Sequence, residues 1–208
     1  MPGHINPLRF PGRLGMITYA TEIYEKTMSA ATETIDRTMS QGVRLAYHGG
    51  TESVIVPEIR DRLHAPDFGR GFYTTESEEQ AMRWAKRVRL VRKSKEAVVT
   101  IYDISALDEG SLAVKLFDGV SEEWFGAVIA CRQGNDVFAE CDVVIGPVAN
   151  DNVYQTIRFF ETGVYSKDEA MRRLLAERLF NQVVFKTPAA LACCRYVSHK
   201  VIDEGALA

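Results

Sequence analysis

Three separated fragments of the chain carry residue types that can hold a sugar and a flat ring. They are residues 47–49 (YHG), 68–73 (FGRGFY) and 182–185 (QVVF). His48 can hydrogen-bond a hydroxyl group, and Gly49 has no side chain, so a ligand can approach its backbone closely. The second fragment adds the Arg70 guanidinium and the Tyr73 ring, and the third adds the uncharged amide of Gln182. Each of these residues alone would more often have a structural role. Only their combination indicates a binding site.

Glycines 69 and 71 do not form one of the common phosphate-binding loops. The Gly-x-Gly-x-x-Gly fingerprint of dinucleotide-binding folds is incomplete, and no clear strand precedes it. The lysine of a P-loop is also missing. A dinucleotide-binding parallel fold is therefore not indicated.

Short strands mixed with helices must position these fragments. An amphipathic helix is expected at residues 17–39, where apolar residues recur every three or four positions. Further helices are expected at residues 77–94, 121–132, 152–161 and 167–180. Expected strands cover residues 43–47, 72–74, 97–104, 111–117, 143–145, 182–186 and 195–202. Because strands and helices do not alternate regularly, the pattern predicts an α+β fold.

Length and composition fit one ordinary globular domain with an added segment. The 208 residues are 46% hydrophobic and 25% charged, which suits a closed core. We expect a leader and helix over residues 1–42 and the main domain over residues 43–208. Residues 1–15 lack the apolar region of a secretory signal, and their Pro and Gly content indicates a loose leader. Met16 is an alternative start.

Charge, hydropathy and cysteine content indicate a cytoplasmic protein. The net charge of −3 argues against nucleic-acid binding through bulk electrostatics alone, although a nucleic acid could still be modified at an active site. No apolar run approaches the ~20 residues of a membrane helix. The four cysteines have no metal-ligand spacing, so we expect reduced thiols and no metal. They are Cys131, Cys141, Cys193 and Cys194.

The first two fragments resemble elements of ADP-ribosyltransferases of the diphtheria-toxin and poly(ADP-ribose) polymerase type, whose signature is His, Tyr and Glu on three strands. Residues 68–85 (FGRGFYTTESEEQAMRWA) reproduce the second of these elements over its whole length. Trp84 follows Tyr73 by eleven residues, where the polymerases place a second stacking aromatic. The resemblance implies an ADP-ribosyltransferase-like fold of split β-sheets with flanking helices, and NAD⁺ as substrate.

The resemblance also implies a role for each residue. His48 would bind the adenosine-side ribose, the Gly49 backbone would pair with the carboxamide, and Tyr73 and Trp84 would stack on the nicotinamide ring. Arg70 could reach the pyrophosphate. Stacking suits this chemistry because the nicotinamide of NAD⁺ is cationic and cleavage leaves an oxocarbenium-like ribose. We expect cleavage of the nicotinamide–ribose bond and mono-ADP-ribosylation of a macromolecule.

Residues 47–201 resemble throughout a bacterial family known as domain of unknown function 3990. Its hallmarks occur here as YHGG, DFGRGFYTT, QAMRWA, DVVIGPVANDNVY and NQVVFKTPAAL. Relatives of this type resemble toxins of two-gene toxin–antitoxin loci. The resemblance therefore implies a toxin with a cognate antitoxin as partner.

The third fragment departs from the transferase pattern. Gln182 stands where the group has glutamate, and an amide carries no charge to stabilise the cationic ribose. Several interpretations stay open: slow transfer, a base from the acceptor, or another carboxylate such as Asp67 or Glu177 in the site. Two rivals are an NAD⁺ glycohydrolase, with water as acceptor, and an inactive NAD⁺-binding or protein-interaction module.

Residues 83–95 (RWAKRVRLVRKSK) contain seven basic residues and no acidic one. Such a run is most often a solvated helix face. Next to a nucleotide site it could instead orient an anionic target such as RNA, DNA or an acidic protein.

Overall fold

The computed structural model describes residues 44–60, 66–108, 112–148, 151–176 and 179–202. All of them belong to the unit formed by residues 44–208. The expected helix at residues 17–39, the segment 1–42 with Met16, and Glu177 lie outside the described residues.

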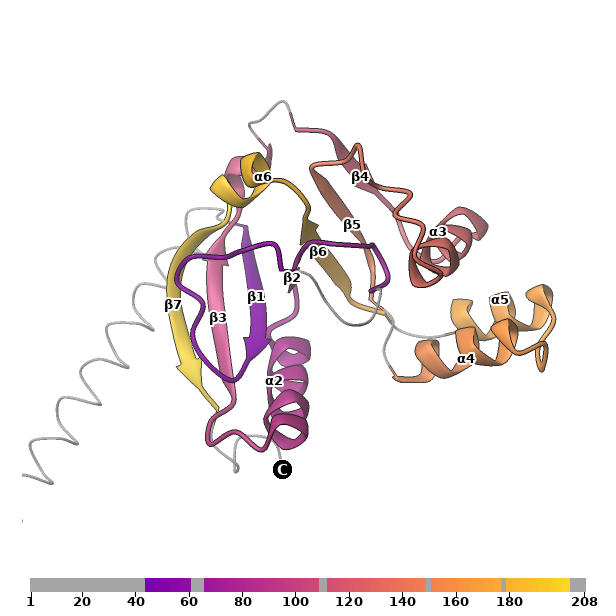
Figure 1. Ribbon diagram of the computed structural model, residues 1–208, viewed down its shortest axis with the longest axis horizontal. Coiled ribbons are helices and arrows are strands. Elements are labelled where there is room, and N and C mark those ends of the chain that lie inside the picture. The colour runs from indigo at the N-terminus through magenta and orange to yellow at the C-terminus, as the bar shows by residue number, and fades with distance from the viewer. Residues whose placement is uncertain (1–43, 61–65, 109–111, 149–150, 177–178, 203–208) are drawn as a thin grey trace, which may run out of the picture. The chain divides into compact units, whose positions relative to one another are not determined.

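The described strands form one seven-stranded sheet in the order β4-β5-β6-β2-β1-β3-β7 (Figure 1). Only β4 and β5 pair in parallel, and every other neighbouring pair is antiparallel. The strands are β1 (Leu45–Gly50), β2 (Phe72–Thr75), β3 (Val98–Asp103), β4 (Val114–Leu116), β5 (Val143–Pro147), β6 (Asn181–Phe185) and β7 (Arg195–Val201). Together with the helices, this sheet confirms the predicted α+β class.

Side-chain caps begin most of the helices. Ser77, Ser121, Ser166 and Thr187 each accept a hydrogen bond from a backbone N–H in the first turn, which satisfies a donor that the helix leaves unpaired. The helices are α2 (Glu78–Arg92), α3 (Glu122–Arg132), α4 (Asp151–Glu161), α5 (Lys167–Leu175) and α6 (Pro188–Ala192), with a 3-10 turn η1 (Ser105–Asp108).

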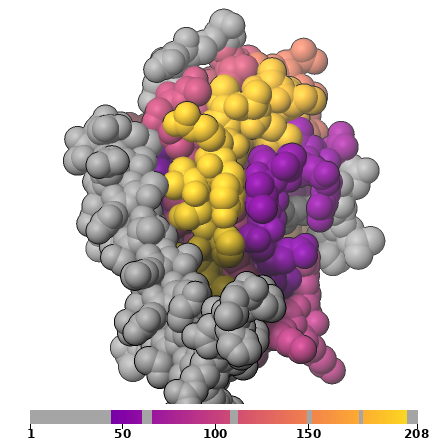
Figure 2. Space-filling view, turned by 90° about the vertical axis from the view of Figure 1, so that its left-hand side faces the viewer, coloured from indigo at the N-terminus to yellow at the C-terminus, as the bar shows by residue number. Residues whose placement is uncertain are grey.

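Alternation along the strands gives the sheet two buried faces. In β6, Val184 packs on the cluster formed by α3, α4 and α5, whereas Val183 and Phe185 pack on the opposite face with α6. The first cluster contains Phe68, Trp124, Phe125, Val128, Val144, Ile157 and Leu174, all essentially buried. Helix α2 covers β1 and β3. On the second face, residue Val54 is held by Thr100 and Tyr102, and Figure 2 shows its segment beside β7.

The join between β1 and β2 is the narrowest in the sheet. Its register comprises one pair, Tyr47 with Thr75, whereas β1 pairs with β3 at six positions. Because this join is hydrogen-bonded, the strands form one continuous sheet, and not the split sheets that the resemblance implied. The residues of interest lie on both sides of this join.

Most element positions agree with the sequence prediction, and the differences have local causes. Strand β1 runs on through His48 and Gly49, which we expected after the strand, because β3 pairs along its whole length. The predicted helix 167–180 ends at Leu175, and the predicted strand 111–117 shortens to β4. Helix α6 was missed because it has only five residues and begins at Pro188, which indicated only a turn.

Candidate functional site

Strand β1 places His48 against the neighbouring strand β2. Its ring stacks on Phe72 with centroids 4.8 Å apart, and its Nδ1 lies 2.7 Å from the carbonyl oxygen of Tyr73. The imidazole therefore spans the narrow join, where the two strands make no further register pair. Since Phe72 belongs to the second buried face, His48 lies on that side of the sheet.

Tyr73 and Gln182 are neighbours on the other face. The register pairs Thr75 with Gln182 and Tyr73 with Val184, so Tyr73 and Gln182 are diagonal neighbours on adjacent strands. Residues so placed have Cα atoms about 7–8 Å apart. Strand order thus brings His48, Tyr73 and Gln182, which are far apart in sequence, onto the adjacent strands β1, β2 and β6.

The Tyr73 hydroxyl fixes the loop that precedes its own strand. It donates to the carbonyl of Gly69 at 2.6 Å and accepts from the N–H of Phe68 at 3.1 Å. Gly69 has φ +73°, and a Cβ at this position would lie 2.5 Å from the Asp136 carboxylate. A side chain here would meet both backbone strain and a steric clash.

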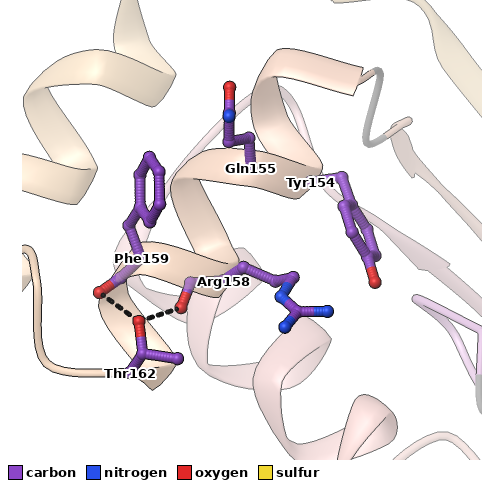
Figure 3. Close-up of a pocket in the computed structure, with 5 residues that line it drawn as sticks. All are labelled: Tyr154, Gln155, Arg158, Phe159 and Thr162. Atoms are coloured by element: carbon purple, nitrogen blue, oxygen red, sulfur yellow. Dashed lines mark hydrogen bonds between the residues drawn. The ribbon is translucent and has the colours of Figure 1, made fainter.

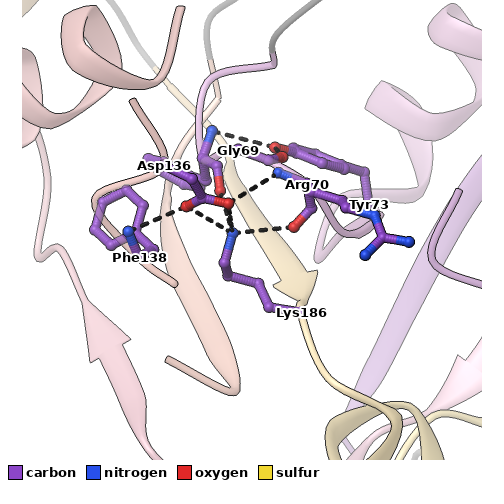
Figure 4. Close-up of polar contacts among 7 residues, drawn as sticks. Gly69, Arg70, Tyr73, Asp136, Phe138 and Lys186 are labelled. Atoms are coloured by element: carbon purple, nitrogen blue, oxygen red, sulfur yellow. Dashed lines mark hydrogen bonds and ion pairs between the residues drawn. The ribbon is translucent and has the colours of Figure 1, made fainter. Parts of the chain in front are cut away.

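A buried lysine holds the same loop from the opposite side (Figure 4). The Lys186 side chain is 3% exposed, and its Nζ donates to the carbonyls of Phe68 and Arg70 at 2.9 and 3.0 Å. The same Nζ donates to both carboxylate oxygens of Asp136, at 3.0 and 2.9 Å. Asp136 also accepts from the backbone N–H of Arg70 at 3.3 Å. We call Lys186 and Asp136 the loop clamp.

A second ion pair stands at the start of the loop. Arg132 at the end of α3 binds Asp67 through Nη2 at 2.7 Å, and both side chains are mostly buried. The guanidinium also lies over the Tyr154 ring, 4.9 Å from its centroid. Asp67, considered above as a substitute carboxylate, is thus committed to Arg132. The structure describes no side chain at position 177.

Gln182 is a buried residue. It is 4% exposed, and its Nε2 donates to the carbonyl of Pro147 at 3.4 Å. Trp124 donates to the same carbonyl at 3.3 Å. This contact gives Gln182 a structural role in joining β6 to the end of β5, in addition to any role toward a ligand.

Helix α2 packs on Gly49 and also carries Trp84. A Cβ on Gly49 would lie 2.2 Å from the Ala81 oxygen and 3.0 Å from the Ala85 nitrogen, so the glycine lets α2 pack directly on β1. Trp84 precedes Ala85 and is 49% exposed. The Arg87 guanidinium lies over its ring at 5.9 Å. Trp84 therefore lies on the helix turn that covers Gly49, with its ring partly in solvent.

A pocket of about 490 Å³ lies elsewhere, along α4 (Figure 3). Its walls are Tyr154, Gln155, Arg158, Phe159 and Thr162, and Thr162 caps the helix end by donating to the Arg158 carbonyl. None of the residues predicted from the sequence lines it. It is formed by side chains of one helix and its end.

Sequence reasoning missed the loop clamp and the Arg132–Asp67 pair. Lys186, Asp136 and Arg132 are 65 or more residues from their partners in the loop, and a lone charged residue gives no sign of its partner. The available signal was Lys186 itself, a charge directly after a strand of buried residues. A charge in that place requires a buried partner or an exposed turn.

The described part of the chain contains neither a cluster of metal ligands nor a helix that could cross a membrane. There, no group of three or more His, Cys, Asp or Glu side chains is arranged to hold a metal ion. Nor does any helix in those ranges have the length and apolar character needed to cross a bilayer. All four cysteines are free, and burial, followed by the neighbouring Cys193, raises the pKa of Cys194 to about 12.

Comparison with known proteins gives one match. Neither the curated proteins nor the solved structures include one that matches this chain. The family described as Protein of unknown function (DUF3990) matches residues 45–196, which include β1, the loop clamp and β6. The chain therefore belongs to the DUF3990 family.

Proposed function

We propose that this protein binds NAD⁺ and transfers its ADP-ribose unit to a macromolecule. The bond from ribose C1′ to the nicotinamide nitrogen breaks, and its electron pair leaves with neutral nicotinamide. A nucleophile of the acceptor then bonds to C1′ and gives up its proton. The observation that carries the proposal is the strand order β6-β2-β1, which places the three fragments on adjacent strands, with His48 on the opposite face of the sheet from Tyr73 and Gln182.

The contacts suggest how the residues would share this work. His48 and the narrow join offer an imidazole and strand-end backbone to a ribose and a carboxamide. Tyr73 offers an aromatic ring whose hydroxyl is already fixed by the loop. Arg70 is exposed on that loop while its backbone is bound by the loop clamp, so its guanidinium could meet the pyrophosphate. Trp84 would form the outer rim.

The neutral, buried Gln182 supports a second candidate. A missing electrostatic partner typically lowers the rate by about 10²–10³, and Asp67 is engaged by Arg132. The protein would then bind NAD⁺ without cleaving it. A third candidate is an NAD⁺ glycohydrolase, which cleaves NAD⁺ with water as the acceptor of ADP-ribose. A bacterial toxin role, with a cognate antitoxin, belongs to the transferase proposal.

The test uses the full chain with NAD⁺ labelled in its adenylate half. Transfer predicts free nicotinamide together with label on protein or nucleic acid in a cell extract. Hydrolysis predicts nicotinamide with free labelled ADP-ribose, and the inactive module predicts binding without nicotinamide. A chain that neither binds NAD⁺ nor releases nicotinamide would reject all three.

Matched variants locate the activity. His48→Ala and Tyr73→Ala should weaken NAD⁺ binding, whereas Gln155→Ala in the α4 pocket should leave it unchanged. Gln182→Glu should raise nicotinamide release by up to about 10²-fold, with some loss of stability because the new carboxylate would face the Pro147 carbonyl. If Gln155→Ala were the variant that lost NAD⁺, the proposed location would be wrong.

A further inference from the structure

Helix α2 and the residues after it present a concentrated positive surface. The run 83–95 has seven basic residues and no acidic one, in a chain whose net charge is −3. Ala81 and Ala85 face the sheet. The exposed basic side chains are Arg83, Arg87, Arg92, Lys93 and Lys95, of which Arg83 is paired with Glu79. We call this set, with Trp84, the α2 surface.

An exposed aromatic ring lies within these charges. Trp84 is 49% exposed, with the Arg87 guanidinium over its ring. Val91, four residues and about one turn beyond Arg87, is 76% exposed on the same side of the helix. A flat ring beside guanidinium groups can stack on an unpaired base while the arginines bind phosphates.

The α2 surface begins where the candidate NAD⁺ site ends. Ala85, next to Trp84, packs its backbone against Gly49. The Arg83 guanidinium lies over the ring of Phe180, 5.6 Å from its centroid. Phe180 stands two residues before Gln182. A chain bound along these arginines would thus pass beside both β1 and the start of β6.

We propose that the α2 surface binds single-stranded nucleic acid and presents it as the acceptor of ADP-ribose. This inference rests on the proposed function and supplies its substrate class. Single strands are favoured over duplexes because only an unpaired base exposes its face to Trp84. An anionic membrane is disfavoured because Arg83 and Arg87 interrupt the apolar side chains of Trp84, Leu90 and Val91 on the exposed side.

The negative charge of the whole chain predicts a binding mode of limited strength. Charges farther than a Debye length, about 8–10 Å in physiological salt, are screened, so only the local arginines and lysines attract the phosphates. Contact with about three phosphates of a single strand predicts a slope near −2 for log affinity against log salt. Binding should therefore weaken steeply between about 50 and 200 mM NaCl.

The first test measures fluorescence anisotropy of labelled oligo(dT) and oligo(U), each about 20 nucleotides long so that a whole site fits. The triple variant Arg87→Gln, Arg92→Gln, Lys93→Gln should bind each oligonucleotide that the wild-type chain binds at least about tenfold more weakly. The control triple Arg60→Gln, Lys167→Gln, Arg172→Gln has the same charge change on other exposed positions. It should stay within about twofold, because screened charges contribute little.

Alternative partners are separate arms of the same experiment. Phosphatidylserine vesicles and polyglutamate should bind less tightly than the oligonucleotides at equal salt. Tighter binding to either probe, or equal losses in the two triple variants, would overturn the inference. The comparison of oligo(dT) with oligo(U) decides between DNA and RNA.

The second test separates this inference from the proposed function. The α2 triple variant should release nicotinamide from NAD⁺ in the absence of acceptor at the wild-type rate, but should lose label transfer to the oligonucleotide. Absence of nicotinamide release from the wild-type chain would reject the proposed function and the acceptor role together. The anisotropy measurement would still decide whether the α2 surface binds single-stranded nucleic acid. Nicotinamide release and oligonucleotide binding without any label transfer would reject the acceptor role alone.

Discussion

Two parts of the candidate site, on either side of the narrow join, are held in place by different means. His48 and Gly49 lie in a strand that pairs with β3 along its length and that α2 contacts through backbone atoms. The loop before Tyr73 has no such pairing and depends on side chains from distant segments, chiefly the loop clamp. The first part is fixed by strand pairing and close backbone packing, and the second by side-chain hydrogen bonds and charge.

This difference determines what each part tolerates. A backbone contact leaves no room for a new atom but is insensitive to pH and to the loss of any one side chain. A polar network accepts small steric changes but fails when one member is removed, because its partners are left buried and unpaired. The glycines of the two fragments therefore have different roles: Gly49 allows backbone packing against α2, whereas Gly69 adopts a positive φ beside the Asp136 carboxylate.

The largest effect should come from Gly49→Ala. The new Cβ would lie 2.2 Å from the Ala81 oxygen, a backbone atom that cannot turn aside, so α2 must move from the sheet. We expect a loss of about 3 kcal/mol or more in the free energy of unfolding, measured by denaturant titration. Gly126→Ala in α3 is the control, because nothing lies within 4 Å of its Cβ position. It should be neutral or stabilising by up to about 1 kcal/mol, and similar losses in both variants would disprove the packing argument.

Lys186→Met should have the next largest effect. It removes the donor from two loop carbonyls and leaves Asp136 without its cation. Because Asp136 is one-third exposed, we expect a loss of about 2–3 kcal/mol, below the range for fully buried pairs. The surface pair of Lys115 and Glu123 gives the control, and Lys115→Met should cost less than about 1 kcal/mol.

The same Lys186→Met variant bears on the site if NAD⁺ is cleaved. A disordered loop should raise the KM for NAD⁺ more than it lowers kcat, and Lys186→Arg should restore part of the affinity. A variant that lost stability with an unchanged KM would show that the clamp serves folding alone.

The sequence was sufficient for the α+β class and for most of the described helices and strands. Periodicity and caps located helices such as α2 and α3, and alternating or continuous apolar runs located strands such as β3 and β6. These are local signals. The adjacency of β1, β2 and β6 and the partners of Lys186 are long-range consequences of packing, which no local pattern records. The burial of Gln182 belongs to the same class, since its neighbours come from β5 and α3.

Tyr73→Phe should have an intermediate effect confined to the loop. The change removes a hydroxyl that bonds both Phe68 and Gly69, so we expect about 1–2 kcal/mol of destabilisation. Hydrogen exchange should show faster exchange of the Phe68 amide. Tyr102→Phe, which removes one bond to Val54 on the other face, should leave that amide protected. Equal loosening of the Phe68 amide in both variants would contradict the separation of the two parts.

Acidification should have the smallest effect on the free energy of unfolding. It should act through Asp142, which contacts the backbone of Lys186 in the loop clamp. The side-chain hydrogen bond from Thr187, followed by the bond from the Ala113 amide, lowers the pKa of Asp142. The Asp142 carbonyl in turn accepts from the Lys186 amide. Because the folded-state pKa is lowered, this stabilisation is present above the usual pKa of about 3.9 and is lost as pH falls through the folded value.

Comparison of the wild-type chain with Asp142→Asn tests this pH dependence. The difference in their unfolding free energies should be constant near neutral pH and should shrink as the pH falls below about 4. The pH dependence of Gly49→Ala should parallel that of the wild type, because its defect is steric. A difference between the wild type and Asp142→Asn that persisted at acid pH would mean that hydrogen-bond geometry, and not the carboxylate charge, stabilises the end of β6 and thereby the clamp.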